Sequence, residues 1–322
     1  MQTQNDKKHQ PMKKITSILC ILCIAVFFSA CKKEGVYTPS KKISKITYHT
    51  NAIDEYGNDI GLLTFTQQWI WNSNNTLKEI VEDYGYGQNT YQFEYDGKKR
   101  LVRVNSGQNY QEYTYDGNYL KEMKRFNKAG AELENYTFIH SNGKICEIRN
   151  ERKYNDNLPK AEWTVSMFSP LQFILPEEVT RLMEKEQKEL ARKNGAKGQI
   201  DQMILKLTWS GGNVTKIVSE VTEGFNDMPD MEGENAKLNL VTHFTTINLQ
   251  YDQCHNPFNG FLMGDMYMGL TNFNKNNVVK MEVNPDGQTG MQPYEEKYTY
   301  SYKQKYPVTK TGTATQEEYE YK

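Results

Sequence analysis

The stretch that decides the fold is YQFEYDGKKRLVRV at residues 91–104, which is followed almost at once by QEYTYDGNYLKEMK at residues 111–124. Both begin with alternating aromatic residues, continue with Tyr-Asp-Gly, and end with two apolar residues three positions apart. Side chains on a β-strand point to alternate faces, so this alternation predicts a strand with its aromatic residues on one face. Asp and Gly favour a tight turn. Each stretch therefore predicts a β-hairpin.

Further copies of this unit occur along the chain, with another aromatic residue or a histidine in the place of Tyr95 and Tyr115. They are the stretches 68–83 with Trp71, 136–151 with His140, 205–220 with Trp209 and 247–261 with Tyr251, and more degenerate copies at 271–283 and 298–312. Asn or Ser replaces the Asp of the motif in some copies, and a catalytic aspartate could not be replaced so freely. The repeat therefore indicates shape and not chemistry. It predicts an all-β domain at 43–322, an antiparallel sheet of consecutive YD-type hairpins, strongly curved or spiralled.

Two segments interrupt the repeats. LPEEVTRLMEKEQKELARKNG, at 175–195, places Pro176 where a first helical residue tolerates proline and Gly195 where a helix can end. Its apolar stripe is narrow, which predicts one surface α-helix at 176–194. The stretch 223–237 is rich in Asp, Glu, Gly and Pro and predicts a long surface loop.

The first 30 residues predict a secretory signal, because lysines precede the apolar run ITSILCILCIAVFF and small residues follow it. That run is shorter than the about 20 residues that cross a bilayer. Either Met1 or Met12 could be the true start. The Ser29-Ala30-Cys31 ending resembles the lipobox of bacterial lipoproteins, although Phe28 stands where that motif prefers an aliphatic residue.

The lipobox resemblance implies that Cys31 becomes the mature N-terminus and carries a lipid; the alternative is an ordinary cleaved signal. Residues 31–42 are polar and predict a flexible tether between that lipid and the domain. The protein would then be anchored to a lipid bilayer without spanning it.

Charge excludes one class of partner. The chain has 39 Lys and Arg against 40 Asp and Glu, and a nucleic-acid-binding protein needs an excess of basic residues on one face. Cys146 and Cys254 remain after the signal and the anchor. An exported compartment permits a disulfide between them, but the sequence leaves open whether they pair.

No motif indicates a cofactor, a metal or a catalytic group. His255 follows Cys254, but no second pair with metal-ligand spacing accompanies it. The acidic residues of 227–234 could hold calcium, but their spacing favours a solvated loop. Trp69, Trp71 and Trp209 are possible ligand-stacking aromatics; the alternative is that the face they share is the core.

The hairpin units resemble YD/RHS-type repeats and, with the lipobox, the uncharacterised repeat lipoproteins of Bacteroidetes. That resemblance implies an all-β fold and an outer-membrane lipoprotein facing the periplasm or the cell surface, and it implies no catalytic residues. The sequence favours a non-enzymatic envelope protein that binds an unknown ligand, glycan or protein. The alternative is an enzyme of the cell envelope that hydrolyses glycan or peptide. Oligomeric state is left open.

Overall fold

The computed structural model describes residues 33–53, 59–107, 109–151, 198–226, 238–262, 272–286, 292–313 and 315–322. The chain divides into residues 1–33 and 34–322, and every described strand lies in the second unit. Cys31, the helix expected at 176–194 and the acidic residues of 227–237 lie outside the described residues.

The described part of the chain contains seventeen β-strands. They are β1 (Ile43–Ile53), β2 (Asp59–Trp71), β3 (Leu77–Asp83), β4 (Gln88–Tyr95), β5 (Leu101–Asn105), β6 (Asn109–Asp116), β7 (Tyr119–Asn127), β8 (Glu132–Ser141), β9 (Lys144–Glu151), β10 (Gly198–Ser210), β11 (Asn213–Asn226), β12 (Leu238–His255), β13 (Asn276–Pro285), β14 (Tyr294–Lys297), β15 (Thr299–Lys303), β16 (Tyr306–Thr311) and β17 (Thr315–Tyr321).

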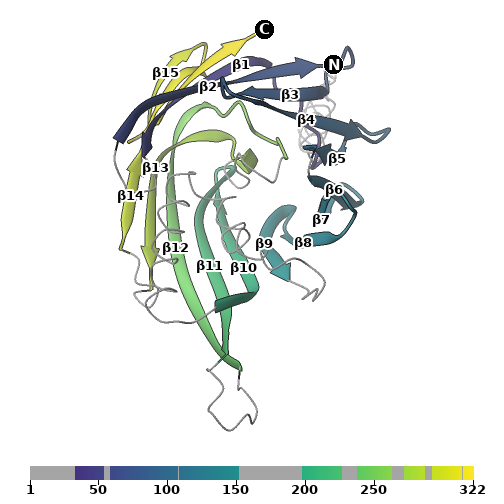
Figure 1. Cartoon of the computed structure of the whole chain (residues 1–322), viewed down its shortest axis with the longest axis vertical. Helices are drawn as coiled ribbons and strands as arrows, with labels where there is room; N and C mark the ends of the chain where they lie inside the picture. The colour runs from purple at the N-terminus through teal and green to yellow at the C-terminus, as the bar shows by residue number, and fades with distance from the viewer. Residues whose placement is uncertain are drawn as a thin grey trace, which may run out of the picture. The chain divides into compact units, whose positions relative to one another are not determined.

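The strands form one antiparallel sheet that closes on itself as a barrel (Figure 1). Consecutive strands pair from β1 through β14, and again from β15 through β17. Only Tyr298 separates β14 from β15, and its amide donates to the carbonyl of Val279 on β13 (2.9 Å).

Closure comes from β1, which pairs with β2 on one side and with β17 on the other. The all-β antiparallel prediction is confirmed. The sheet is strongly curved, as predicted, but it is a barrel and not a spiral, because the first and last strands pair and leave no open edge between them.

The repeat units form the expected hairpins. In each copy the pairing register shifts immediately before the aromatic or histidine of the motif, which lies at or within four residues of the end of its strand. We call these the latch residues: Trp71, Tyr95, Tyr115, His140, Trp209 and Tyr251. A register shift of this kind is a β-bulge, which twists the strand and re-aims the next side chain.

The turn of the opening motif uses its aspartate as expected, but not its glycine. One carboxylate oxygen of Asp96 accepts the amides of Lys98 (2.8 Å) and Arg100 (2.9 Å). The left-handed backbone conformation falls on Lys99 (φ 62°) and not on Gly97. In the second copy Gly117 does adopt positive φ (58°). The same Asp-Gly pair therefore supports two different turns.

The two ends of the barrel differ. At the short-turn end lie the hairpin turns β2–β3, β4–β5, β6–β7, β8–β9, β10–β11 and β15–β16, together with the start of β1 and the end of β17. At the opposite end, which we call the long-connection end, lie the connections β1–β2, β3–β4, β5–β6, β7–β8, β13–β14 and β16–β17, with the ends of β9 and β11. The inner face of the barrel carries the buried apolar residues of nearly every strand, and these form one core cluster.

Candidate functional site

The latch residues join neighbouring hairpins around the short-turn end. Most of them reach a main-chain carbonyl on the first or second residue of an earlier strand. The donors and acceptors are Trp71 Nε1 to Ile43 (2.8 Å), Tyr115 Oη to Leu101 (2.6 Å), Trp209 Nε1 to Ile145 (2.6 Å) and Tyr251 Oη to Val214. Tyr95 Oη instead bonds to the backbone of Leu77, in the sense that lowers its pKa, so the Leu77 amide donates to it. Tyr321 Oη makes an equivalent bond to Pro307 (2.8 Å). Tyr and Trp can replace each other here because each offers an apolar ring with one donor at its tip.

Burial raises the pKa of the Tyr95, Tyr115 and Tyr251 hydroxyls well above the ordinary value. These hydroxyls therefore remain protonated donors at physiological pH. These three tyrosines are part of the fold and are not available for acid–base chemistry.

A Tyr115→Phe variant tests the latch. It removes one hydrogen bond to the Leu101 carbonyl and keeps the ring, so we expect the free energy of unfolding to fall by about 1 kcal/mol. Urea denaturation measures this loss. Tyr110→Phe is the matched control, because Tyr110 lies on the outer face and stacks on Phe126 through its ring (4.9 Å between centroids); its stability should stay within about 0.5 kcal/mol of the wild type. Equal losses of unfolding free energy in both variants would contradict a stabilising hydrogen bond from Tyr115 to Leu101.

His140 departs from this pattern, and the N-terminal segment compensates for it. A carboxylate oxygen of Glu34 lies 2.9 Å from His140 Nε2 and accepts the amide of Leu120 (2.6 Å). The amide of Glu34 donates to the carbonyl of Asn118 (3.0 Å). Glu34 thus joins β7 and β8 at the one copy whose latch residue is neither Tyr nor Trp.

Residues 34–42 therefore pack on the barrel, where the sequence had suggested a flexible tether over 31–42. Tyr37 is 4% exposed and its hydroxyl donates to the carbonyl of Pro257 (2.7 Å). Its ring contacts Trp71 and Phe261, with centroids 5.7 and 5.1 Å away. Residues 256–262, which follow β12, supply Phe261 and Leu262 to the same core. Two separate segments thus meet inside the short-turn end.

The aromatic residues proposed for ligand stacking lie in or against this core. Trp69 is 3% exposed. Trp71 and Trp209 are partly buried, and both donate their indole nitrogen to a main-chain carbonyl as latch residues. The structure brings Trp69 and Trp71 together, with ring centroids 6.5 Å apart, and leaves Trp209 on another strand. In this position Trp69 offers no surface for a ligand.

The cysteines and His255 form no site. Cys146 and Cys254 are both free thiols. The His255 ring packs against Tyr306, with centroids 5.0 Å apart. No group of His, Cys, Asp and Glu in the described ranges is arranged to hold a metal ion.

A polar layer lines the inner face toward the long-connection end. There a Glu or Gln and a Tyr two residues away on the same strand face join through the Tyr hydroxyl. The pairs are Tyr84–Glu82 (2.8 Å), Tyr113–Gln111 (2.6 Å), Tyr136–Glu134 (3.3 Å), Tyr319–Glu317 and Tyr294–Glu296. The first four read Glu/Gln-x-Tyr in the sequence, a pattern that marks these pairs.

An aromatic series rises from this polar layer to the surface on β1, β2 and the turn after β3. It consists of Tyr48, Phe65, Tyr84 and Tyr86, stacked in that order with centroids 4.6, 5.3 and 6.0 Å apart. Tyr48 and Phe65 are direct cross-strand partners. The series ends at Tyr86, whose side chain is 87% exposed.

Hydrogen bonds fix the inner part of this aromatic series from below. Tyr48 Oη donates to Gln67 (3.2 Å), whose amide donates to Glu82 (2.7 Å), and Tyr84 Oη donates to the other oxygen of Glu82 (2.8 Å). Gln67 and Glu82 are 1% and 0% exposed. The rings of Tyr48 and Tyr84 are thus held in place before any ligand arrives. Sequence reasoning missed this arrangement because it depends on the register between strands.

Two further inner-face polar atoms have no hydrogen-bond partner among the described residues: Ser219 Oγ and His243 Nδ1. Their strands pair so that Ser219 faces Thr245 and His243 faces Val221. Buried polar atoms normally have a partner, so an unpaired one invites an explanation such as water or a ligand.

The outer face of the barrel is charged. Cross-strand ion pairs cover it, among them Lys45–Glu320 (3.6 Å), Arg103–Glu112 (3.3 Å), Lys206–Glu220 and Lys280–Glu295 (2.8 Å). A barrel whose strands face lipid alternates in the opposite sense, with apolar residues outside and polar residues inside.

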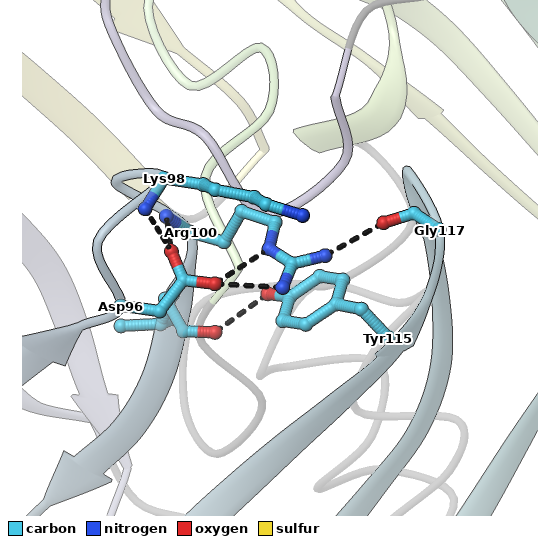
Figure 2. Close-up of polar contacts among 6 residues, drawn as sticks. Asp96, Lys98, Arg100, Tyr115 and Gly117 are labelled. Atoms are coloured by element: carbon cyan, nitrogen blue, oxygen red, sulfur yellow. Dashed lines mark hydrogen bonds and ion pairs between the residues drawn. The ribbon is translucent and has the colours of Figure 1, made fainter.

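Around the β4–β5 turn, polar groups hold the guanidinium of Arg100 in place (Figure 2). The Arg100 guanidinium contacts Asp96 Oδ2 through Nε and Nη2, each at 2.7 Å, and donates to the carbonyl of Gly117 (2.7 Å). It also lies over the ring of Tyr115, 4.3 Å from the centroid. Arg100 therefore braces two neighbouring hairpins.

In the described part of the chain, no helix is long and apolar enough to cross a membrane.

Comparison with known proteins gives likeness of structure alone. No family model and no curated protein matches the chain. Among solved structures, a porin-like protein from Bacteroides uniformis is 11% identical, covers 90% of this chain and 100% of its own, and has a TM-score of 0.44. A porin-like protein from Bacteroides vulgatus is 12% identical, covers 76% of this chain and 98% of its own, and has a TM-score of 0.30.

Proposed function

We propose that this chain is a lipid-anchored protein of the bacterial envelope that binds a glycan, without catalysis, at the aromatic series Tyr48, Phe65, Tyr84 and Tyr86. The observation that carries the proposal is the stacked, partly exposed series held on a buried Gln67–Glu82 pair. Flat aromatic faces can pack against the apolar faces of sugar rings, while neighbouring carboxylate and amide groups accept hydrogen bonds from hydroxyls.

Pre-organisation supports a binding role. Tyr48 and Tyr84 are fixed by hydrogen bonds to buried groups, so little side-chain freedom is lost when a ligand stacks on them. Tyr86 is 87% exposed and adds an adaptable outer surface. The unpaired Ser219 and His243 atoms on the inner face are further polar groups that a ligand in the barrel could meet.

The lipid anchor is inferred from the lipobox resemblance that ends at Cys31. In this proposal Cys31 carries the lipid that holds the protein at the outer membrane, and the charged outer face keeps the barrel in water. A Cys31→Ala variant expressed in cells fed radioactive palmitate should lose the label; a variant that still incorporates it would contradict the anchor.

Glycan-array and envelope pull-down binding by a chain that begins at residue 32 tests the binding role. Tyr86→Ala should weaken the binding of the glycan so found about tenfold, because one stacking face is lost. Its melting temperature should be unchanged, since the side chain is 87% exposed.

Phe244→Ala is the matched control, because Phe244 is also an exposed aromatic residue (44%) but lies on the outer face. Glycan affinity should be the same as in the wild type. If Tyr86→Ala and Phe244→Ala have the same affinity as the wild type, the ligand does not stack on this series.

A further inference from the structure

The short-turn end of the barrel is strongly basic. Its described turns, the segments that cover it and the strand residues beside them carry ten cations: Lys41, Lys42, Lys98, Lys99, Arg100, Lys144, Lys275, Lys303, Lys305 and Lys322. The same region includes four acids, Glu34, Asp96, Asp116 and Asp252. Glu34 is held by His140, Asp96 by Arg100, and Asp252 by hydrogen bonds from Tyr302 and Asn277.

The opposite end has the reverse balance. Its described connections and flanking strand residues carry Lys128 against three acids: Asp83, Glu132 and Asp286. The chain as a whole has a formal net charge of −1. The positive charge is therefore concentrated at one end of a nearly neutral molecule.

The latch residues position several of these cations at the rim. Lys42 lies over the Trp71 ring, 5.5 Å from its centroid, and Lys144 lies over the Trp209 ring at 4.9 Å. Lys41 lies over Tyr306 at 5.3 Å. Each aromatic ring is anchored in the barrel, so its cation is held at the end of the molecule while the charged group remains accessible to solvent.

The N-terminal segment enters the domain at this same end. Only Lys32 and Lys33 separate Cys31 from Glu34, whose amide is bonded to Asn118 in the β6–β7 turn. Three residues of extended chain reach about 10 Å. A lipid on Cys31 would therefore hold the basic end within about one Debye length of the membrane surface.

We propose that the basic short-turn end docks on the anionic headgroups of the membrane that holds the lipid, so that the long-connection end and its aromatic series point away from the bilayer. This inference rests on the proposed lipid anchor. A lipid chain combined with a polybasic patch gives firm attachment where either signal alone is weak, and each basic residue near an anionic surface contributes to binding. An acidic polysaccharide is the competing partner, and the test below separates the two.

The experiment uses the lipid-free chain from residue 32, because residues 34–322 form a compact unit with its own core. Co-sedimentation is measured with vesicles of phosphatidylcholine alone and with vesicles that contain phosphatidylglycerol in a three-to-one mixture. We expect binding to the anionic vesicles only, weakened by added salt. The triple variant Lys98→Gln, Lys303→Gln, Lys305→Gln should lower that binding about tenfold or more.

These three lysines are exposed, so their replacement should leave the melting temperature unchanged. The matched control replaces Lys121, Lys128 and Lys216 by Gln, which removes the same charge from exposed positions on the barrel wall and the opposite end. Its vesicle binding should equal that of the wild type.

Equal losses in the two triple variants would show that net charge and not this end is responsible, and would overturn the proposal. So would equal sedimentation with both kinds of vesicle, or binding to dextran sulfate in the absence of vesicle binding. Palmitate labelling at Cys31 is measured separately. A wild-type protein that takes up no label would overturn the anchor, while vesicle binding by the lipid-free chain would still report on the basic end.

Discussion

Replacing Gly35 with alanine should lower the free energy of unfolding by about 3 kcal/mol, as measured by urea denaturation. An alanine Cβ at this position would lie 2.0 Å from the hydroxyl oxygen of Tyr115, and the backbone φ of +76° is one that L-residues rarely adopt. The Tyr115 hydroxyl cannot move freely, because it donates to the Leu101 carbonyl at 2.6 Å. The added methyl group must therefore displace the N-terminal segment.

Gly85→Ala is the control for the backbone contribution. Gly85 has nearly the same φ, +81°, but no atom lies within 4 Å of an added Cβ. It should lose only the about 1 kcal/mol that a left-handed alanine costs. Hydrogen exchange gives a second readout: the Leu101 amide donates to Gly35 and the Leu120 amide to Glu34, so both should exchange faster in Gly35→Ala. Equal stability in the two variants would mean that residues 34–42 do not pack as described.

The hairpins could be predicted from the sequence because their causes are local. The alternation in 91–104 places Tyr91, Phe93 and Tyr95 on one face, and all three lie on the inner face of the barrel. Asp96 forms its turn through amides two and four residues away. Each of these interactions involves residues that a reader of the sequence sees side by side.

Closure of the barrel could not be predicted in this way. It requires β1 to pair with β17, and Tyr48 with Glu317, across most of the length of the chain. Nothing in either strand marks the other as its partner, because an antiparallel pair is joined by main-chain hydrogen bonds that any residues except proline can make. The alternation fits an open spiral and a closed barrel equally well.

The candidate site was missed for a related reason. Tyr48, Phe65 and Tyr84 lie on three different segments and meet only through the registers of β1–β2 and β2–β3. Trp69 and Trp71, in contrast, stood out in the sequence by residue type, although their alternation with neighbours already allowed a core position. Residue type indicated aromatic packing, while the register decided which aromatic residues reach the surface.

Trp69→Ala should give the largest loss of stability, about 3–5 kcal/mol, with a matching fall in melting temperature. The side chain is 3% exposed and meets four aromatic rings: Tyr37, Trp71, Phe258 and Phe261, with centroids 6.4, 6.5, 6.0 and 5.1 Å away. These rings come from the N-terminal segment, from β2 and from the segment after β12. Truncation leaves a cavity between three parts of the chain that no single side chain can refill.

Two variants separate this effect from a role in binding. Trp69→Phe keeps most of the ring contacts and loses the indole bond to Gln67 (3.2 Å), so it should lose less than Trp69→Ala. Phe244→Ala, at a 44% exposed position on the outer face, should change stability by less than about 1 kcal/mol. A Trp69→Ala protein as stable as the wild type but weaker in glycan binding would return Trp69 to the ligand site and remove it from the core. The ring contacts favour the opposite result, because a side chain enclosed by four others stabilises the barrel whether or not a ligand is bound.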